Sequence, residues 1–230
     1  MKKILTLIVS LLMVISMAVL FVACSDNTDN GGNNGGDNTN QGGDNTDDDN
    51  NDDTNLDVTI SDESLIADLD GHSLWVTSIG QAADYDTLIT LLTNSSTVGL
   101  VEGTDFTADS TLTANEVAAG DTDIIVAGAS TKGMGGAGVD AAGEISRAQA
   151  FAAKTDINII VAQLGGSARR GETSDAIFAA VCPVASVTLA VSSADNDGMF
   201  SGTWCANTPL YLYSRATNMA ASLKFILGVD

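Results

Sequence analysis

The 230-residue sequence is poor in the residues that most often carry acid–base and metal chemistry, with one histidine, three cysteines and two prolines. The histidine, His72, stands at the start of the first predicted strand, roughly 25 Å from the other end of the sheet. Catalysis at that end by a Ser–His or Cys–His pair is therefore nearly excluded. No group of Cys and His residues is spaced for zinc, so we expect no metal site.

Basic residues are also scarce. The chain has nine Lys and Arg against 30 Asp and Glu, a formal charge of −21. Residues 57–230 hold 21 of the acidic and seven of the basic residues, a net charge of −14. Such a surface repels nucleic acid and anionic lipid headgroups, which argues against both as partners.

The N-terminus has the pattern of a secretion signal. Lys2 and Lys3 precede a mainly apolar run over 4–23, and Phe21-Val22-Ala23-Cys24 is typical of a lipobox. We expect residues 1–24 to be a lipoprotein signal peptide with lipid attached at Cys24. The protein would then lie in the cell envelope, outside the cytoplasm, touching the membrane through this anchor only. The alternative is an uncleaved signal anchor.

Residues 25–56 consist almost entirely of Asn, Asp, Gly and Thr. They cannot bury enough apolar surface to offset chain entropy, so the sequence predicts a disordered linker. The remaining residues, 57–230, are numerous enough for a single domain with a substantial core.

Strand-like and helix-like segments alternate through this domain. Strand character is found at 73–79, 124–127, 157–164, 187–191 and 210–213, with a further short apolar run at 98–101. Helices are expected at 84–93, 113–119, 141–154, 175–181, 199–205 and 216–227. Candidate N-caps are Thr113 with Glu116 three positions later, Asp140, and Thr173 or Ser174. This order predicts an α/β fold: a three-layer, doubly wound, mainly parallel sheet of five or six strands, Rossmann-like or flavodoxin-like.

Right-handed crossovers place the loops that follow the strands at one sheet edge, where open α/β folds bind ligands. Three of the domain's seven cations lie in these loops: Lys132, Arg169 and Arg170. We therefore expect a small anionic molecule to bind there. The candidate ligand-binding residues are Ser78, Gln81, Ser130, Lys132, Gly133, Gly135, Gly138, Arg169, Arg170, Asp175, Asn196 and Asp197.

The loop over 128–140 contains five glycines, of which Gly133, Gly135 and Gly138 match G-x-G-x-x-G. The match is weak as a dinucleotide signature, because no acidic residue closes the next strand to hold a ribose. The sequence thus specifies no cofactor. The alternative interpretation is a flexible glycine-rich turn.

Arg169 and Arg170 offer planar donor groups suited to carboxylate or phosphate. Adjacent side chains seldom point the same way, so we expect one to face the crevice and the other to pair with Asp175 or Glu172. The alternative is that both are structural.

Two further features stay open. Asp195-Asn196-Asp197-Gly198 resembles part of a calcium loop, but Ser193 and Trp204 stand where carboxylates are required, so a turn is expected. Cys182 and Cys205 could form a disulfide or remain free thiols.

Four blocks carry a resemblance to a known family: Thr77-Ser-Ile-Gly-Gln81, the stretch 128–140, the stretch 165–175 and Asn196-Asp-Gly198. Together they resemble an uncharacterised bacterial family, the domain of unknown function numbered 6305. The resemblance runs from about Ser73 to the C-terminus. It implies a secreted or lipid-anchored single α/β domain and supplies no activity, substrate or catalytic residue.

The leading functional hypothesis is a lipid-anchored module that binds a small anionic ligand. A second hypothesis is a metal-independent, His-independent hydrolase or transferase, which would have to use Asp84, Lys132, Asp140, Asp175 or Asp197. A third is an envelope module that binds a protein partner.

Overall fold

The structure is a computed structural model that describes residues 58–229. The predicted signal peptide with its lipidation site Cys24 lies outside the described residues, as does the whole of the predicted linker over 25–56. Within 58–229, none of the helices combines the length and the apolar character needed to cross a membrane.

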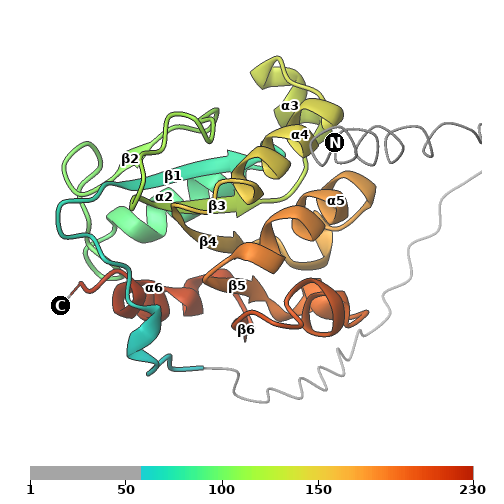
Figure 1. Ribbon diagram of the computed structural model, residues 1–230. Coiled ribbons are helices and arrows are strands. Elements are labelled where there is room, and N and C mark those ends of the chain that lie inside the picture. The colour runs from blue at the N-terminus through green and yellow to red at the C-terminus, as the bar shows by residue number, and fades with distance from the viewer. Residues whose placement is uncertain (1–57, 230) are drawn as a thin grey trace, which may run out of the picture. The chain divides into compact units, whose positions relative to one another are not determined.

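The sheet has six parallel strands in the order β2-β1-β3-β4-β5-β6 (Figure 1). The strands are β1 (Leu74–Ile79), β2 (Thr107–Ala108), β3 (Thr122–Ala127), β4 (Asn158–Gln163), β5 (Val187–Val191) and β6 (Leu210–Tyr213). The first five follow the flavodoxin-like order, which reverses direction between β1 and β3. The predicted mainly parallel α/β sheet is therefore confirmed.

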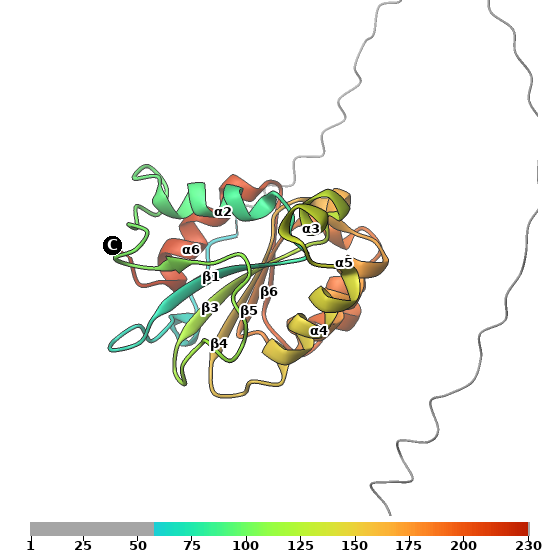
Figure 2. The same cartoon turned by 90° about the horizontal axis from the view of Figure 1, so that it is seen from above.

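Helices cover both faces of the sheet (Figure 2). They are α2 (Asp84–Thr93), α3 (Thr131–Ala137), α4 (Ala141–Ala152), α5 (Glu172–Val181) and α6 (Ala220–Ile226). A π-helix spans Phe200–Trp204, and 3-10 turns span Glu63–Leu65, Gly166–Arg169, Cys182–Val184, Ser192–Asp195 and Ala216–Met219.

Alternation along the strands builds one core on each face. On β3, Ile124 and Val126 pack in the core with α2 and α6. Ile125 and Ala127 pack in the other core with α4 and α5. This is why the strands read as continuous apolar runs in the sequence.

One local prediction for the segment between α2 and β3 was wrong. Residues 113–119 form turns and not a helix. The Glu116 carboxylate accepts hydrogen bonds from the backbone N–H of Thr113 (2.8 Å) and from its hydroxyl (2.7 Å). The two expected capping residues therefore stabilise a turn and not the start of a helix. The short apolar run at 98–101 forms no strand; the edge strand is the two-residue β2, too short to leave a pattern in the sequence.

The start of α5 also differs from the prediction. Its N-cap is Gly171, which has a φ of 133° and no side chain. Ser174 instead accepts a hydrogen bond from the backbone N–H of Ala129 (2.8 Å), which links α5 to the loop after β3.

Candidate functional site

A cleft of about 490 Å³ opens at the carboxyl ends of β1 and β3, where the order of the sheet reverses. Open α/β sheets bind their ligands at this position. The cleft is lined by Ser78, Gln81, Ala82, Ala83, Tyr85, Asp86, Ser110, Ser130, Lys132 and Gly133. Five of these were predicted from the sequence as ligand-binding residues: Ser78, Gln81, Ser130, Lys132 and Gly133.

The turn after β1 forms one wall of the cleft. Gly80 has a φ of 97°, and a Cβ there would lie 2.4 Å from the carbonyl oxygen of Gly128. Only glycine therefore lets the loops after β1 and β3 approach so closely. The next residue, Gln81, also has a positive φ, 56°, and its side-chain amide donates to the carbonyl of Ser110 (2.8 Å).

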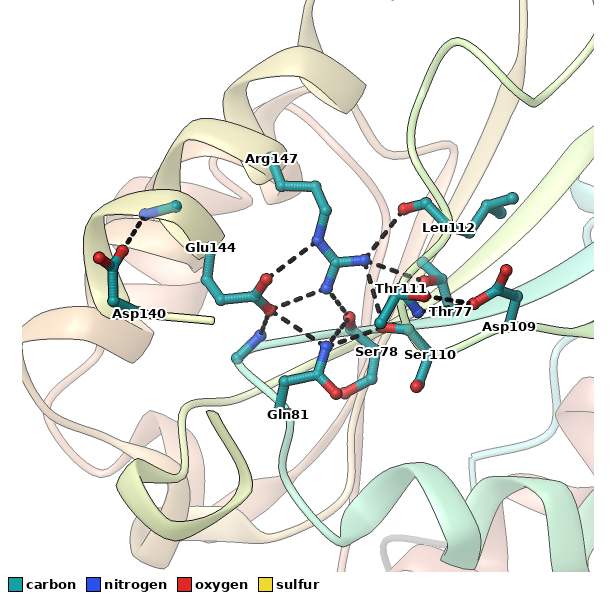
Figure 3. A network of polar contacts seen from close by, with 12 residues as sticks. Thr77, Ser78, Gln81, Asp109, Ser110, Thr111, Leu112, Asp140, Glu144 and Arg147 are labelled. Atoms are coloured by element: carbon teal, nitrogen blue, oxygen red, sulfur yellow. Dashed lines mark hydrogen bonds and ion pairs between the residues drawn. The ribbon is translucent and has the colours of Figure 1, made fainter. Parts of the chain in front are cut away.

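A buried ion pair, Glu144 with Arg147, fixes this turn (Figure 3). The Glu144 carboxylate accepts hydrogen bonds from the backbone N–H of Gly80 (2.6 Å) and from the Arg147 guanidinium (2.8 Å). The guanidinium also donates to the carbonyls of Leu112 (2.9 Å), Ser110 (3.2 Å) and Ser78. Arg147 is thus a structural group that ties α4 to the cleft loops, with its donors already used.

The other wall is α3, which corrects the expectation of a glycine-rich loop over 128–140. Ser130 caps the helix by accepting from the N–H of Gly133 (3.1 Å). A Cβ on Gly133 would lie 1.8 Å from the Gln81 carbonyl oxygen, so this glycine lets the helix pack against the β1 turn. Gly138 ends the helix in the left-handed conformation, with a φ of 72°.

The three glycines predicted as ligand-binding residues therefore do not all line the cleft. Gly133 lines the cleft, whereas Gly135 and Gly138 do not. The G-x-G-x-x-G spacing, a weak match to the dinucleotide signature in the sequence, belongs to a short helix and its C-cap.

Ser78 and Lys132 each carry a polar group that lacks a protein partner within residues 58–229. Ser78 is 1% exposed, and its hydroxyl has no hydrogen-bond partner among residues 58–229. Lys132 is exposed on α3, and its ammonium forms no ion pair with any residue in the same part of the chain. Burial, followed by nearby carboxylates, raises the pKa of Tyr85 to about 12, so its hydroxyl stays a neutral donor.

Arg169 is already paired. Its Nε lies 3.2 Å from the carboxylate of Asp84, the first residue of α2. A Cβ on Gly165 would lie 2.5 Å from the Asp84 carboxylate and 2.3 Å from the Arg169 side chain, so this glycine makes room for the pair.

Arg170 links its own loop to α5 and to the segment that follows β5. It donates to Asp175 (2.7 Å), to Asp197 (2.9 Å) and to the carbonyl of Ala194, and its guanidinium lies 4.8 Å from the centre of the Trp204 ring. The hydrogen bond from Arg170 holds the pKa of the Asp197 carboxyl below its usual value. The expectation that one of the two arginines pairs with Asp175 is confirmed. The other also has a carboxylate partner.

The turn over 195–198 serves the π-helix that follows it. Asp195 accepts a hydrogen bond from the N–H of Phe200 (2.7 Å), while Asn196 is exposed. Asn196, Asp197 and Asp175 are not among the residues that line the cleft. No group of three His, Cys, Asp or Glu side chains within 58–229 is arranged to hold a metal ion.

Five cleft residues were missed by sequence reasoning, three of them polar: Tyr85, Asp86 and Ser110, beside Ala82 and Ala83. Tyr85 and Asp86 lie on the first turn of α2, where the sequence indicated only an amphipathic helix. Ser110 follows β2, the strand without a sequence pattern. A polar first helical turn directly after the β1 loop was the one signal available.

The family described as Domain of unknown function (DUF6305) matches residues 71–227, which include the whole sheet and all cleft residues. No curated protein and no solved structure matches the chain.

Proposed function

The chain belongs to the DUF6305 family, whose description carries no activity, and we propose from the site that it binds a small molecule with an anionic group in the cleft between β1 and β3. One observation carries the proposal: the cleft at the reversal of the sheet holds an exposed lysine and a buried hydroxyl, both without a partner among the residues that the structure describes. An ammonium group attracts a carboxylate or phosphate, and a buried hydroxyl without a partner is costly unless something completes its hydrogen bonding.

The other lining groups favour a ligand with hydroxyl or carbonyl groups beside its charge. Ser110 and Ser130 line the cleft with hydroxyl-bearing side chains, and Tyr85 adds a neutral phenol. Asp86 is exposed at the same cleft and would repel a ligand that carried several negative charges. The proposed ligand therefore has one anionic end and a polar, uncharged body.

Thermal unfolding of the full-length chain in detergent, against a panel of carboxylated and phosphorylated metabolites, tests this proposal. A ligand at 100 times its Kd adds about 2.7 kcal/mol, which raises the Tm by very roughly 5–10 °C. Lys132→Gln and Ser78→Ala should each reduce that rise.

Arg215→Gln is the matched control, because it removes one exposed cation after β6 and changes the net charge equally. A ligand whose effect is the same in Lys132→Gln and in Arg215→Gln would refute the role of the cleft lysine. If no anionic compound raises the Tm, the anionic-ligand proposal fails.

We propose in addition that a lipid on Cys24 anchors the domain to the cell envelope. The support is the sequence alone: a basic start, an apolar run and Cys24 directly before a polar stretch. Metabolic labelling with a fatty acid should mark the wild-type chain and not Cys24→Ala. Equal labelling of both would overturn the proposal.

A further inference from the structure

A pair of buried cysteines lies on the β5 side of the molecule, away from the proposed cleft. Cys182 follows α5 and is 0% exposed; Cys205 follows the π-helix and is 5% exposed. Both are free thiols in the same apolar core. Neither has a role in the site described above.

Thr208 links the backbones of the two cysteines through two hydrogen bonds. Its N–H donates to the carbonyl of Cys205 (3.2 Å), and its hydroxyl donates to the carbonyl of Cys182 (3.1 Å). Aromatic packing holds the same two elements in contact, since the ring centres of Phe178 on α5 and Phe200 on the π-helix are 4.8 Å apart. The backbones of the two cysteines are thus held close together in the same core.

We propose that Cys182 and Cys205 form a reversible dithiol–disulfide pair that exchanges with small-molecule disulfides. Closing the bond would link the end of α5 to the end of the π-helix. The closed loop would contain β5 and the turn that carries Asp197, the partner of Arg170. Oxidation would therefore stiffen the side of the molecule that Arg170 holds together.

The two cysteines differ in how readily they can react first. Cys205 is the less buried, and its interaction with Cys182 lowers the pKa of its thiol to about 7. Burial raises the pKa of the Cys182 thiol well above its usual value. Thiolates and not thiols attack disulfides, so Cys205 is the entry point.

The exchange has two balanced steps. The Cys205 thiolate attacks one sulfur of the reagent, forms a mixed disulfide and releases the other half of the reagent as a thiolate. Cys182 then loses its proton and attacks the Cys205 Sγ, which forms the internal disulfide and releases the second reagent thiolate. The protein loses two electrons and two protons; the reagent disulfide takes up both and becomes two thiols.

The test uses the full-length chain in detergent with oxidised glutathione, followed by alkylation in denaturant, trypsin and mass measurement. Trypsin leaves Cys182 and Cys205 together in the fragment 171–215 and leaves Cys24 in a different fragment. We expect the 171–215 fragment to change from doubly alkylated to unalkylated and two daltons lighter than the dithiol, and dithiothreitol to reverse this. The Tm of the oxidised chain should rise by about 10 °C.

Equilibrium is approached from both directions, once from the folded reduced chain and once from chain refolded in the same glutathione buffer. If the fragment stays doubly alkylated from both starting points, or retains glutathione as a stable mixed disulfide, the proposal is wrong.

Single variants separate the two steps. In Cys182→Ser, Cys205 should accumulate one glutathione, because nothing can displace it. In Cys205→Ser, Cys182 should stay unmodified in the folded chain. Modification of Cys182 in that variant, with none of Cys205 in the other, would overturn the proposed order of attack.

Discussion

The two halves of the sheet's carboxyl edge use their cations in opposite ways. Beside β4 and β5, Arg169 and Arg170 are both bound to carboxylates. Beside β1 and β3, Lys132 projects from α3 at a cleft without an ion-pair partner among the described residues. All three follow strands and looked equivalent in the sequence.

The difference shows that an arginine in a strongly acidic domain is a poor indicator of a ligand. A guanidinium has five donors and finds carboxylates and carbonyls in neighbouring loops, which it then holds in place. Arg170 connects α5 to the turn after β5 in this way, and Arg147 does the same beneath the cleft. A lysine has fewer donors and a flexible stem, and Lys132 has no carboxylate partner among the described residues.

Removing the buried guanidinium of Arg147 should have the largest effect on the free energy of unfolding. Arg147→Leu leaves Glu144, 2% exposed, as an uncompensated buried charge and frees the carbonyls that Arg147 binds. We expect a loss of about 3–5 kcal/mol in the free energy of unfolding, measured by urea denaturation. A loss below about 1 kcal/mol would show that the network in Figure 3 is not what fixes the cleft wall.

The second prediction concerns the pH dependence of stability that arises from the buried carboxyl group of Asp123. Asp123 on β3 is fully buried with both carboxylate oxygens unpartnered within 58–229, and burial raises its pKa to about 8. The folded state therefore holds its proton while the unfolded state loses it near 3.8. Stability from this group is complete below about pH 4 and is lost as the pH rises toward 8, by a few kcal/mol.

Asp123→Asn removes this titration, so the variant should gain on the wild type as the pH rises from 4 to 8. Urea denaturation at each pH measures the difference. A constant difference across this range would mean that Asp123 is ionised in the folded protein.

Most of the fold could be predicted because the apolar pattern of the strands is strong in the sequence. Five of the six strands appear as apolar runs, since helices cover both faces of a parallel sheet. The sixth, β2, has two residues and no such run. The helix α3 was missed because Gly133, Gly135 and Gly136 oppose helix formation on intrinsic preference. Tertiary packing decides there: the space beside the Gln81 carbonyl admits only glycine.

The site was predictable in position and less so in composition. Parallel topology places the loops at one edge, and Ser78, Gln81, Ser130, Lys132 and Gly133 do line one cleft. The sequence cannot show which cations find carboxylate partners, because the partners are distant along the chain. Asp84 is 85 residues from Arg169, and Asp197 is 27 residues from Arg170.

On the arginine side, Arg170→Leu should destabilise the fold less than Arg147→Leu. Its partner Asp197 is half exposed, so solvent screens the pair, and we expect a loss of about 2 kcal/mol. The pKa of Asp197 is lowered in the folded protein. The pair therefore stabilises the protein fully above pH 3.8, the usual pKa of this carboxyl group, and this stabilisation is lost as the pH falls further. Urea denaturation at pH 7 and pH 3 should show a smaller difference between variant and wild type at pH 3. An equal difference at both would mean that Arg170 acts mainly by packing on Trp204.

The smallest effect on stability is expected at Lys132. Lys132→Gln breaks no described ion pair, so the free energy of unfolding should change by less than about 0.5 kcal/mol. Arg169→Gln is the matched comparison, because it leaves Asp84 buried beside Gly165 without its partner and should cost more. If Lys132→Gln destabilises the protein as much as Arg169→Gln, the lysine is structural as well, and the two halves of the edge do not differ in the way proposed.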